Sequence, residues 1–209
     1  MSEMIGNGLQ FAVVAGLAVY SMIFFLRNRN QQYFILASFY GSFALGSGYW
    51  LIYFLKFSYT PRFFYVSDLS WIASYLFLVL LCVLTASPQE KGYRPVAAWV
   101  VAAILSVLTI RMLREGDVLI TLIWNGLMIL LGFLSTRGFL YARKQTGIAR
   151  EKQVFYGTVF AVVVIEFGLW MVSLYSSDGT WSGPYFWFDI ALTASLIALF
   201  FAVKKVTRP

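Results

Sequence analysis

The sequence predicts an all-α polytopic membrane protein, a bundle of seven transmembrane helices that forms one domain over residues 1–209. Composition is the first observation: 60% of the residues are hydrophobic and only 12% are charged, about half the charged fraction of an average soluble domain. The second is a series of apolar segments close to the roughly 20 residues that a helix needs to cross a bilayer. Period-two alternation is absent, so helices rather than barrel strands are expected.

Seven apolar segments follow one another with only short polar connections between them. The first has the position of a secretory signal, but its leader contains Glu3 and no Lys or Arg, and Arg27 follows it where small cleavage-site residues would stand. We therefore expect it to be a mature helix. The fourth segment is the shortest and carries Arg111 near its end. The predicted spans are residues 9–26, 33–55, 64–86, 96–113, 118–136, 154–175 and 185–203.

The basic residues predict the orientation of these spans, because Lys and Arg in short loops are retained on the cytoplasmic side. Twelve of the sixteen Lys and Arg residues fall on one set of flanks and four on the other. This distribution places the N-terminus outside and the C-terminus in the cytoplasm, which requires an odd number of spans. The predicted location is the plasma membrane of a bacterium.

Single residue counts exclude several kinds of chemistry. The chain has no histidine, so a His-ligated haem or zinc and a His-dependent nucleophile are impossible. Cys82 is the only cysteine and lies inside an apolar segment, where a buried thiol is the simplest interpretation. The net charge of +7 is spread over membrane flanks, so nucleic acid is not an expected partner. We expect no metal, no cofactor and no catalytic residues.

Three carboxylates fall within the predicted spans, and all three lie in the outer half. Asp68 and Asp189 lie about four residues inside their spans, and Glu166 lies about nine residues deep. A charged group near the centre of a bilayer costs roughly 2.5–3.5 kcal/mol on insertion scales, so such groups face the bundle interior, pair with a partner, or line a wet cavity. The sequence offers no Lys or Arg at the depth of Glu166 to pair with it.

Tryptophan has the same uneven distribution. Six of the seven tryptophans map to the outer half or the outer loops, with an interfacial belt as the alternative role for each one. Carboxylates and aromatic faces together suit a small cationic or amphipathic ligand, through charge and cation–π contact. The residues predicted to bind such a ligand are Asp68, Trp71, Trp124, Asn125, Glu166, Trp170 and Asp189.

The second and third spans resemble part of a family of bacterial sensory modules. Over about 50 residues the chain has Tyr49-Trp50, Pro61, Ser67-Asp68, Trp71 and an aromatic-rich helix that begins near Tyr75. This pattern is similar to the multi-spanning N-terminal modules that precede diguanylate cyclase and histidine kinase domains. The resemblance implies a sensor. Because this chain ends at Pro209 without an output domain, it would act through a separate protein.

A weaker resemblance is to the microbial rhodopsins, which also have seven helices, an outside N-terminus and aspartates in helices three and seven. Asp68 and Asp189 would be the similar positions. The family binds retinal through a lysine four residues after the second aspartate, and this chain has Thr193 there. The resemblance therefore implies a relative that cannot form the Schiff base.

These observations leave three functions open, of which the third is the rhodopsin-like protein that cannot form a retinal Schiff base. The leading one is a sensor-like or ligand-binding membrane module with an acidic and aromatic pocket that faces outward. The alternative is a small-solute or proton-coupled transporter, which would need polar groups in the inner half, where the sequence offers only Ser and Thr such as Thr158. An intramembrane enzyme is disfavoured. The basic segment 137–153 is predicted to contact anionic lipid or a cytoplasmic protein partner.

Overall fold

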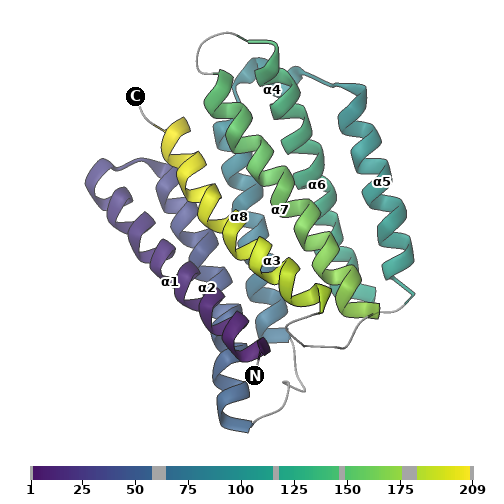
Figure 1. Ribbon diagram of the computed structural model, residues 1–209. Helices are drawn as coiled ribbons and strands as arrows, with labels where there is room; N and C mark the ends of the chain where they lie inside the picture. Colours follow the sequence, from purple (N-terminus) through teal and green to yellow (C-terminus); the bar gives the residue numbers. More distant parts are fainter. Residues whose placement is uncertain (1, 58–64, 115–117, 146–148, 176–182, 208–209) are drawn as a thin grey trace.

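The computed structural model is entirely helical in the residues that it describes, which are 2–57, 65–114, 118–145, 149–175 and 183–207 (Figure 1). Each predicted span corresponds to one helix, and a short additional helix lies between the third and fourth spans. In chain order the helices are α1 (Ser2–Asn28), α2 (Gln31–Phe57), α3 (Tyr65–Thr85), α4 (Pro88–Gly92), α5 (Val96–Met112), α6 (Val118–Arg143), α7 (Ala149–Tyr175) and α8 (Pro184–Val206).

Six of the helices are long and apolar enough to cross a membrane: α1, α2, α3, α6, α7 and α8. The chain is therefore a multi-pass helical membrane protein by length and composition. Helix α5 has 17 residues and is also apolar. It runs alongside α6 from one end of the bundle to the other, and the N- and C-termini lie at opposite ends (Figure 1). We name these the N-terminal end and the C-terminal end of the bundle.

The six long helices form a closed ring. Each packs on the next in the order α1, α2, α3, α6, α7 and α8, and α8 packs back on α1. Helix α5 lies outside this ring against α6, where Gly132 makes room for it: a Cβ at Gly132 would lie 2.6 Å from Leu105 Cδ1. Most of the outward side chains of α5 are large and apolar, including Trp99 and Val107, as a lipid-facing surface requires.

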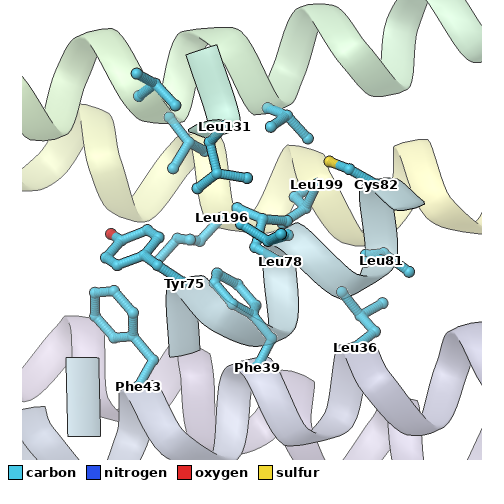
Figure 2. Packing of buried hydrophobic residues seen from close by; sticks show 14 of the residues in the cluster. Leu36, Phe39, Phe43, Tyr75, Leu78, Leu81, Cys82, Leu131, Leu196 and Leu199 are labelled. Atoms are coloured by element: carbon cyan, nitrogen blue, oxygen red, sulfur yellow. The ribbon is translucent and has the colours of Figure 1, made fainter. Parts of the chain in front are cut away.

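The interior of the ring is filled by large apolar side chains. Leu78 of α3, Leu131 of α6 and Leu196 of α8 converge there and are fully buried (Figure 2). Tyr40 of α2 is also fully buried, and its hydroxyl donates a hydrogen bond to the Leu196 carbonyl at 2.7 Å. This bond satisfies the only polar atom that the Tyr40 side chain brings into the core.

Two details differ from the sequence-based expectations. The first is α4, which the sequence analysis treated as part of a connection. The second concerns the predicted basic loop from Arg137 to Lys152. Helix α6 extends to Arg143, seven residues beyond the predicted end of the span, and α7 begins at Ala149. Most of these basic residues therefore belong to α6 and α7 and not to a loop, because the helices continue past the apolar stretch that defined the spans.

Candidate functional site

Glu166 is buried in the interior of the ring, with a hydrogen-bond donor from across the bundle. Its side chain is 4% exposed, and the Tyr75 hydroxyl of α3 donates to its Oε1. The Tyr75 ring is held by three aromatic neighbours on α2 and α6, with centroid distances of 6.2 Å to Phe39, 6.3 Å to Phe43 and 6.4 Å to Trp124. Figure 2 shows Tyr75 among the labelled Phe39 and Phe43. The hydroxyl that meets Glu166 is therefore fixed by packing.

Asp189 has a different partner, Gln10 of α1, which is bound in turn by Ser47 of α2. Gln10 Nε2 donates to Asp189 Oδ1 at 2.8 Å, and Ser47 Oγ donates to Gln10 Oε1 at 3.3 Å. A Cβ at Gly6 would lie 2.9 Å from Asp189 Oδ2, so α1 approaches this carboxyl closely because it has a glycine there. Asp189 is 6% exposed, and the side-chain donor that it receives from another helix is the neutral Gln10 amide.

The two carboxyls belong to one region at the N-terminal end of the bundle. Asp189 of α8 and Glu166 of α7 lie on helices that pack on each other, within electrostatic range of one another. In the part of the chain that the structure describes, neither carboxyl forms an ion pair with Lys or Arg. The Tyr75 hydroxyl and the Gln10 amide are their donors. We name Gln10, Ser47, Tyr75, Glu166 and Asp189 the carboxyl cluster.

Aromatic rings flank the carboxyl cluster on the side of α6 and α7. Trp124 is 3% exposed and lies 5.1 Å from Trp170 and 5.7 Å from Phe167, between ring centroids. It also contacts the Tyr75 ring edge to face, with an interplanar angle of 89°. Trp124 therefore links the Tyr75 ring to Trp170, and the role of both tryptophans in ligand binding stays a prediction.

The other three predicted site residues have different surroundings. Trp71 packs on Phe43 and against Gly46 of α2, where an added Cβ would lie 2.6 Å from the indole nitrogen. Asn125 is fully buried, and among the described residues its amide has no hydrogen-bond partner. Asp68 lies half-buried in the first turn of α3. Pro61 and Trp181 lie outside the described residues.

Sequence reasoning missed the donors of the carboxyl cluster. Gln10 is the one long amide side chain inside the apolar stretch of α1, and this isolated polar residue was an available signal. Tyr75 carried no such signal, since a tyrosine in an aromatic-rich helix is ordinarily a packing residue. Thr193, which the resemblance to the rhodopsins pairs with their retinal lysine, is buried, and its hydroxyl donates to the Asp189 carbonyl at 3.0 Å.

A second polar group that the sequence analysis missed lies at the C-terminal end. Glu90 of α4 is 0% exposed, and its Oε2 forms an ion pair with Lys152 Nζ of α7 at 3.2 Å. Lys152 Nζ also donates to the Thr85 carbonyl at 3.0 Å, and Gln32 Nε2 donates to Thr85 Oγ1 at 3.2 Å. A sequence signal did exist, because Ser87 and Glu90 have the spacing of a helix N-cap and its third residue. The Ser87 hydroxyl accepts from the Glu90 amide at 3.2 Å.

The comparisons add no relative to this description. No protein-family model matches the chain, and no curated protein or solved structure is significantly similar to it. Within the described ranges, no group of three His, Cys, Asp or Glu side chains is placed to hold a metal ion.

Proposed function

We propose that the chain is a non-enzymatic sensory membrane module that binds a small cation or amphipathic amine at the carboxyl cluster. The observation that carries the proposal is the presence of two buried carboxyls on the neighbouring helices α7 and α8, in the same region as two tryptophans in ring contact. We further propose a seven-span topology with the N-terminal end of the bundle outside. Twelve of the sixteen basic residues flank the opposite, cytoplasmic side.

The electrostatics of the cluster favour a positively charged ligand. Glu166 and Asp189 have neutral donors only, so the region carries acidic groups that no described cation offsets. A cation placed between them would gain from both carboxyls in a medium of low dielectric constant. The faces of Trp124 and Trp170 would add a cation–π contribution of about 0.5–2 kcal/mol.

Burial of both carboxyls links binding to helix movement. Because the side chains are only 4% and 6% exposed, a ligand must displace the Tyr75 hydroxyl, the Gln10 amide or both to reach them. These two hydrogen bonds connect α3 to α7 and α1 to α8. A ligand that replaces these two hydrogen bonds binds more tightly to a conformation in which α3 and α7, or α1 and α8, have separated. A sensor needs such a difference in affinity between two conformations. The partner that receives the signal would bind the basic helix ends around residues 137–153.

Thermal unfolding of the purified full chain in detergent tests this proposal. The probes are tetramethylammonium, choline and a series of primary alkylamines, with sodium chloride at matched ionic strength as the reference. We expect members of the series to raise the unfolding midpoint of the wild type. Glu166→Gln and Asp189→Asn should abolish the increase. Glu151→Gln, which removes a carboxylate at the other end of the bundle, should retain it.

Two results would overturn the ligand site. One is an increase in midpoint that survives in both carboxyl variants, because the ligand would then bind elsewhere. The other is a full series of cations with no effect beyond that of sodium chloride. Asp68→Asn also belongs in the experiment, because loss of the increase in this variant would extend the site to the start of α3.

A proton-coupled transporter is the second candidate, and one observation favours it. Such a protein needs polar groups in the inner half of the membrane, and Glu90 and Tyr156 supply them at the C-terminal end of the bundle. Reconstituted proteoliposomes with an internal pH-sensitive dye test this function. Acidification that requires both an imposed solute gradient and Glu166 would favour transport over sensing.

A further inference from the structure

Unpartnered polar atoms gather at the C-terminal end of the bundle. Among the buried side-chain atoms of the described residues that have no hydrogen-bond partner, five lie on α4, α6 and α7 at this end. Native proteins leave few such atoms unsatisfied, because each costs roughly 1–3 kcal/mol when it is dry. The five atoms are Glu90 Oε1, Thr136 Oγ1, Arg137 Nε, Glu151 Oε2 and Tyr156 Oη.

Several of these groups lie near one another. The Tyr156 hydroxyl faces Glu90, and both Glu90 and Arg137 lie within electrostatic range of Cys82. Lys152 pairs with the other oxygen of the Glu90 carboxylate. The Tyr156 ring lies directly against the α6 backbone, since a Cβ at Gly138 would lie 2.4 Å from two of its ring carbons. The Tyr156 hydroxyl is therefore held in place facing Glu90, although no described residue forms a hydrogen bond of good geometry with it.

The chemistry of these atoms indicates which ligand they suit. Glu90 and Glu151 contribute two negative charges, and Arg137 and Lys152 contribute two positive charges, so the region favours neither an anion nor a cation. Carboxylate oxygens accept hydrogen bonds, the guanidinium nitrogen donates, and hydroxyls do both. A small neutral molecule that donates and accepts satisfies such a mixture, and water is the molecule that proteins ordinarily bury in this way.

We propose that the C-terminal end of the bundle contains a site for internal water molecules, bounded by α4, α6 and α7 and reaching as far as Tyr156. This site does not depend on the proposed ligand at the carboxyl cluster. Ten residues of α7, about 15 Å of helix, separate Tyr156 from Glu166. Between them lie fully buried apolar side chains, Val159 and Val163 of α7 and Leu131 of α6. An apolar layer therefore divides the water site from the carboxyl cluster.

Radiolytic hydroxyl labelling of the full chain in detergent micelles tests the proposal directly. A short X-ray pulse converts bound water to hydroxyl radicals, which modify adjacent side chains even when these are buried. Tyr40 is the matched control, because it is also fully buried but donates its hydroxyl to the Leu196 carbonyl in the apolar core. We expect Tyr156 to be modified severalfold faster than Tyr40. Equal, slow modification of the two tyrosines would overturn the proposal.

The direction in which a substitution changes the thermal midpoint tests the water site independently. Tyr156→Phe removes a hydroxyl and leaves the ring. If the site is dry, removal of an unsatisfied group raises the thermal midpoint, whereas loss of a water-mediated hydrogen bond lowers it. We expect a lowered midpoint, in the same direction as the effect of Tyr40→Phe, which loses a direct hydrogen bond. An unchanged or raised midpoint for Tyr156→Phe would contradict the water site.

Discussion

The ion pair between Glu90 and Lys152 predicts an asymmetric response to mutation. The Glu90 carboxylate is 0% exposed, whereas the Lys152 side chain is 22% exposed. Lys152→Met keeps most of the aliphatic stem and removes the charge, so it leaves a buried carboxylate without its cation. Removal of one partner of a buried pair in this way costs about 3–5 kcal/mol.

Substitution of the other partner, Glu90, leaves the Lys152 ammonium with a hydrogen-bond acceptor and with access to solvent. After Glu90→Gln, Lys152 still donates to the Thr85 carbonyl and still reaches solvent. The expected loss in the free energy of unfolding is about 0.5–1.5 kcal/mol, the contribution of one ordinary hydrogen bond. The double variant has no uncompensated charge, so it should be closer in stability to Glu90→Gln than to Lys152→Met.

Reversible unfolding in mixed micelles, with a rising fraction of sodium dodecyl sulfate and tryptophan fluorescence as the signal, measures all three free energies. Lys205→Met is the control, because Lys205 is an exposed lysine in the last turn of α8 and should change stability little. The reasoning fails if Lys152→Met costs no more than Glu90→Gln. It fails equally if the two single losses add up in the double variant, since a pair in contact must be coupled.

Two further predictions follow from packing and hydrogen bonds, both measured by the same unfolding titration. Gln10→Met removes the donor to Asp189 and should destabilise the bundle by about 1–3 kcal/mol, and this loss should shrink in the Asp189→Leu background, where no buried carboxyl needs a donor. Gly138→Ala forces a Cβ into the Tyr156 ring and should cost about 1–3 kcal/mol. Gly41→Ala, where a Cβ meets no atom within 4 Å, should be neutral or stabilise the helix by up to about 1 kcal/mol, so equal effects of the two glycine substitutions would contradict the packing argument.

The spans could be predicted from the sequence because length and apolarity are local properties. The predicted start of the span at residue 118 coincides with the start of α6, and the predicted end at residue 175 coincides with the end of α7. The far end of α6 was underestimated because a helix continues into polar residues once it leaves the apolar layer. Helix α4 was missed for a related reason, since its five residues include no apolar stretch.

The partners of the carboxyls could not be predicted, because they depend on how the helices are arranged around the ring. Tyr75 and Glu166 lie 91 positions apart, and Gln10 and Asp189 lie 179 positions apart. No spacing rule within one helix relates such residues. Depth along the helix was the guide to which polar and aromatic side chains share a site, and depth does not give direction around the helix axis. Asp68 was assigned to the site by its depth alone, and its place in the site stays a prediction.

Closure of the ring between α1 and α8 has a consequence for biosynthesis. Helix α1 finds its neighbour α2 soon after both emerge from the ribosome, but its other neighbour is translated more than 150 residues later. During that interval the Gln10 amide has no Asp189 to bind and faces the lipid or the translocon. The last step in assembly of this protein is therefore formation of the interface between its first helix, α1, and its last helix, α8. A ribosome that stalls before α8 would release an open bundle with a polar edge for quality-control proteases to recognise.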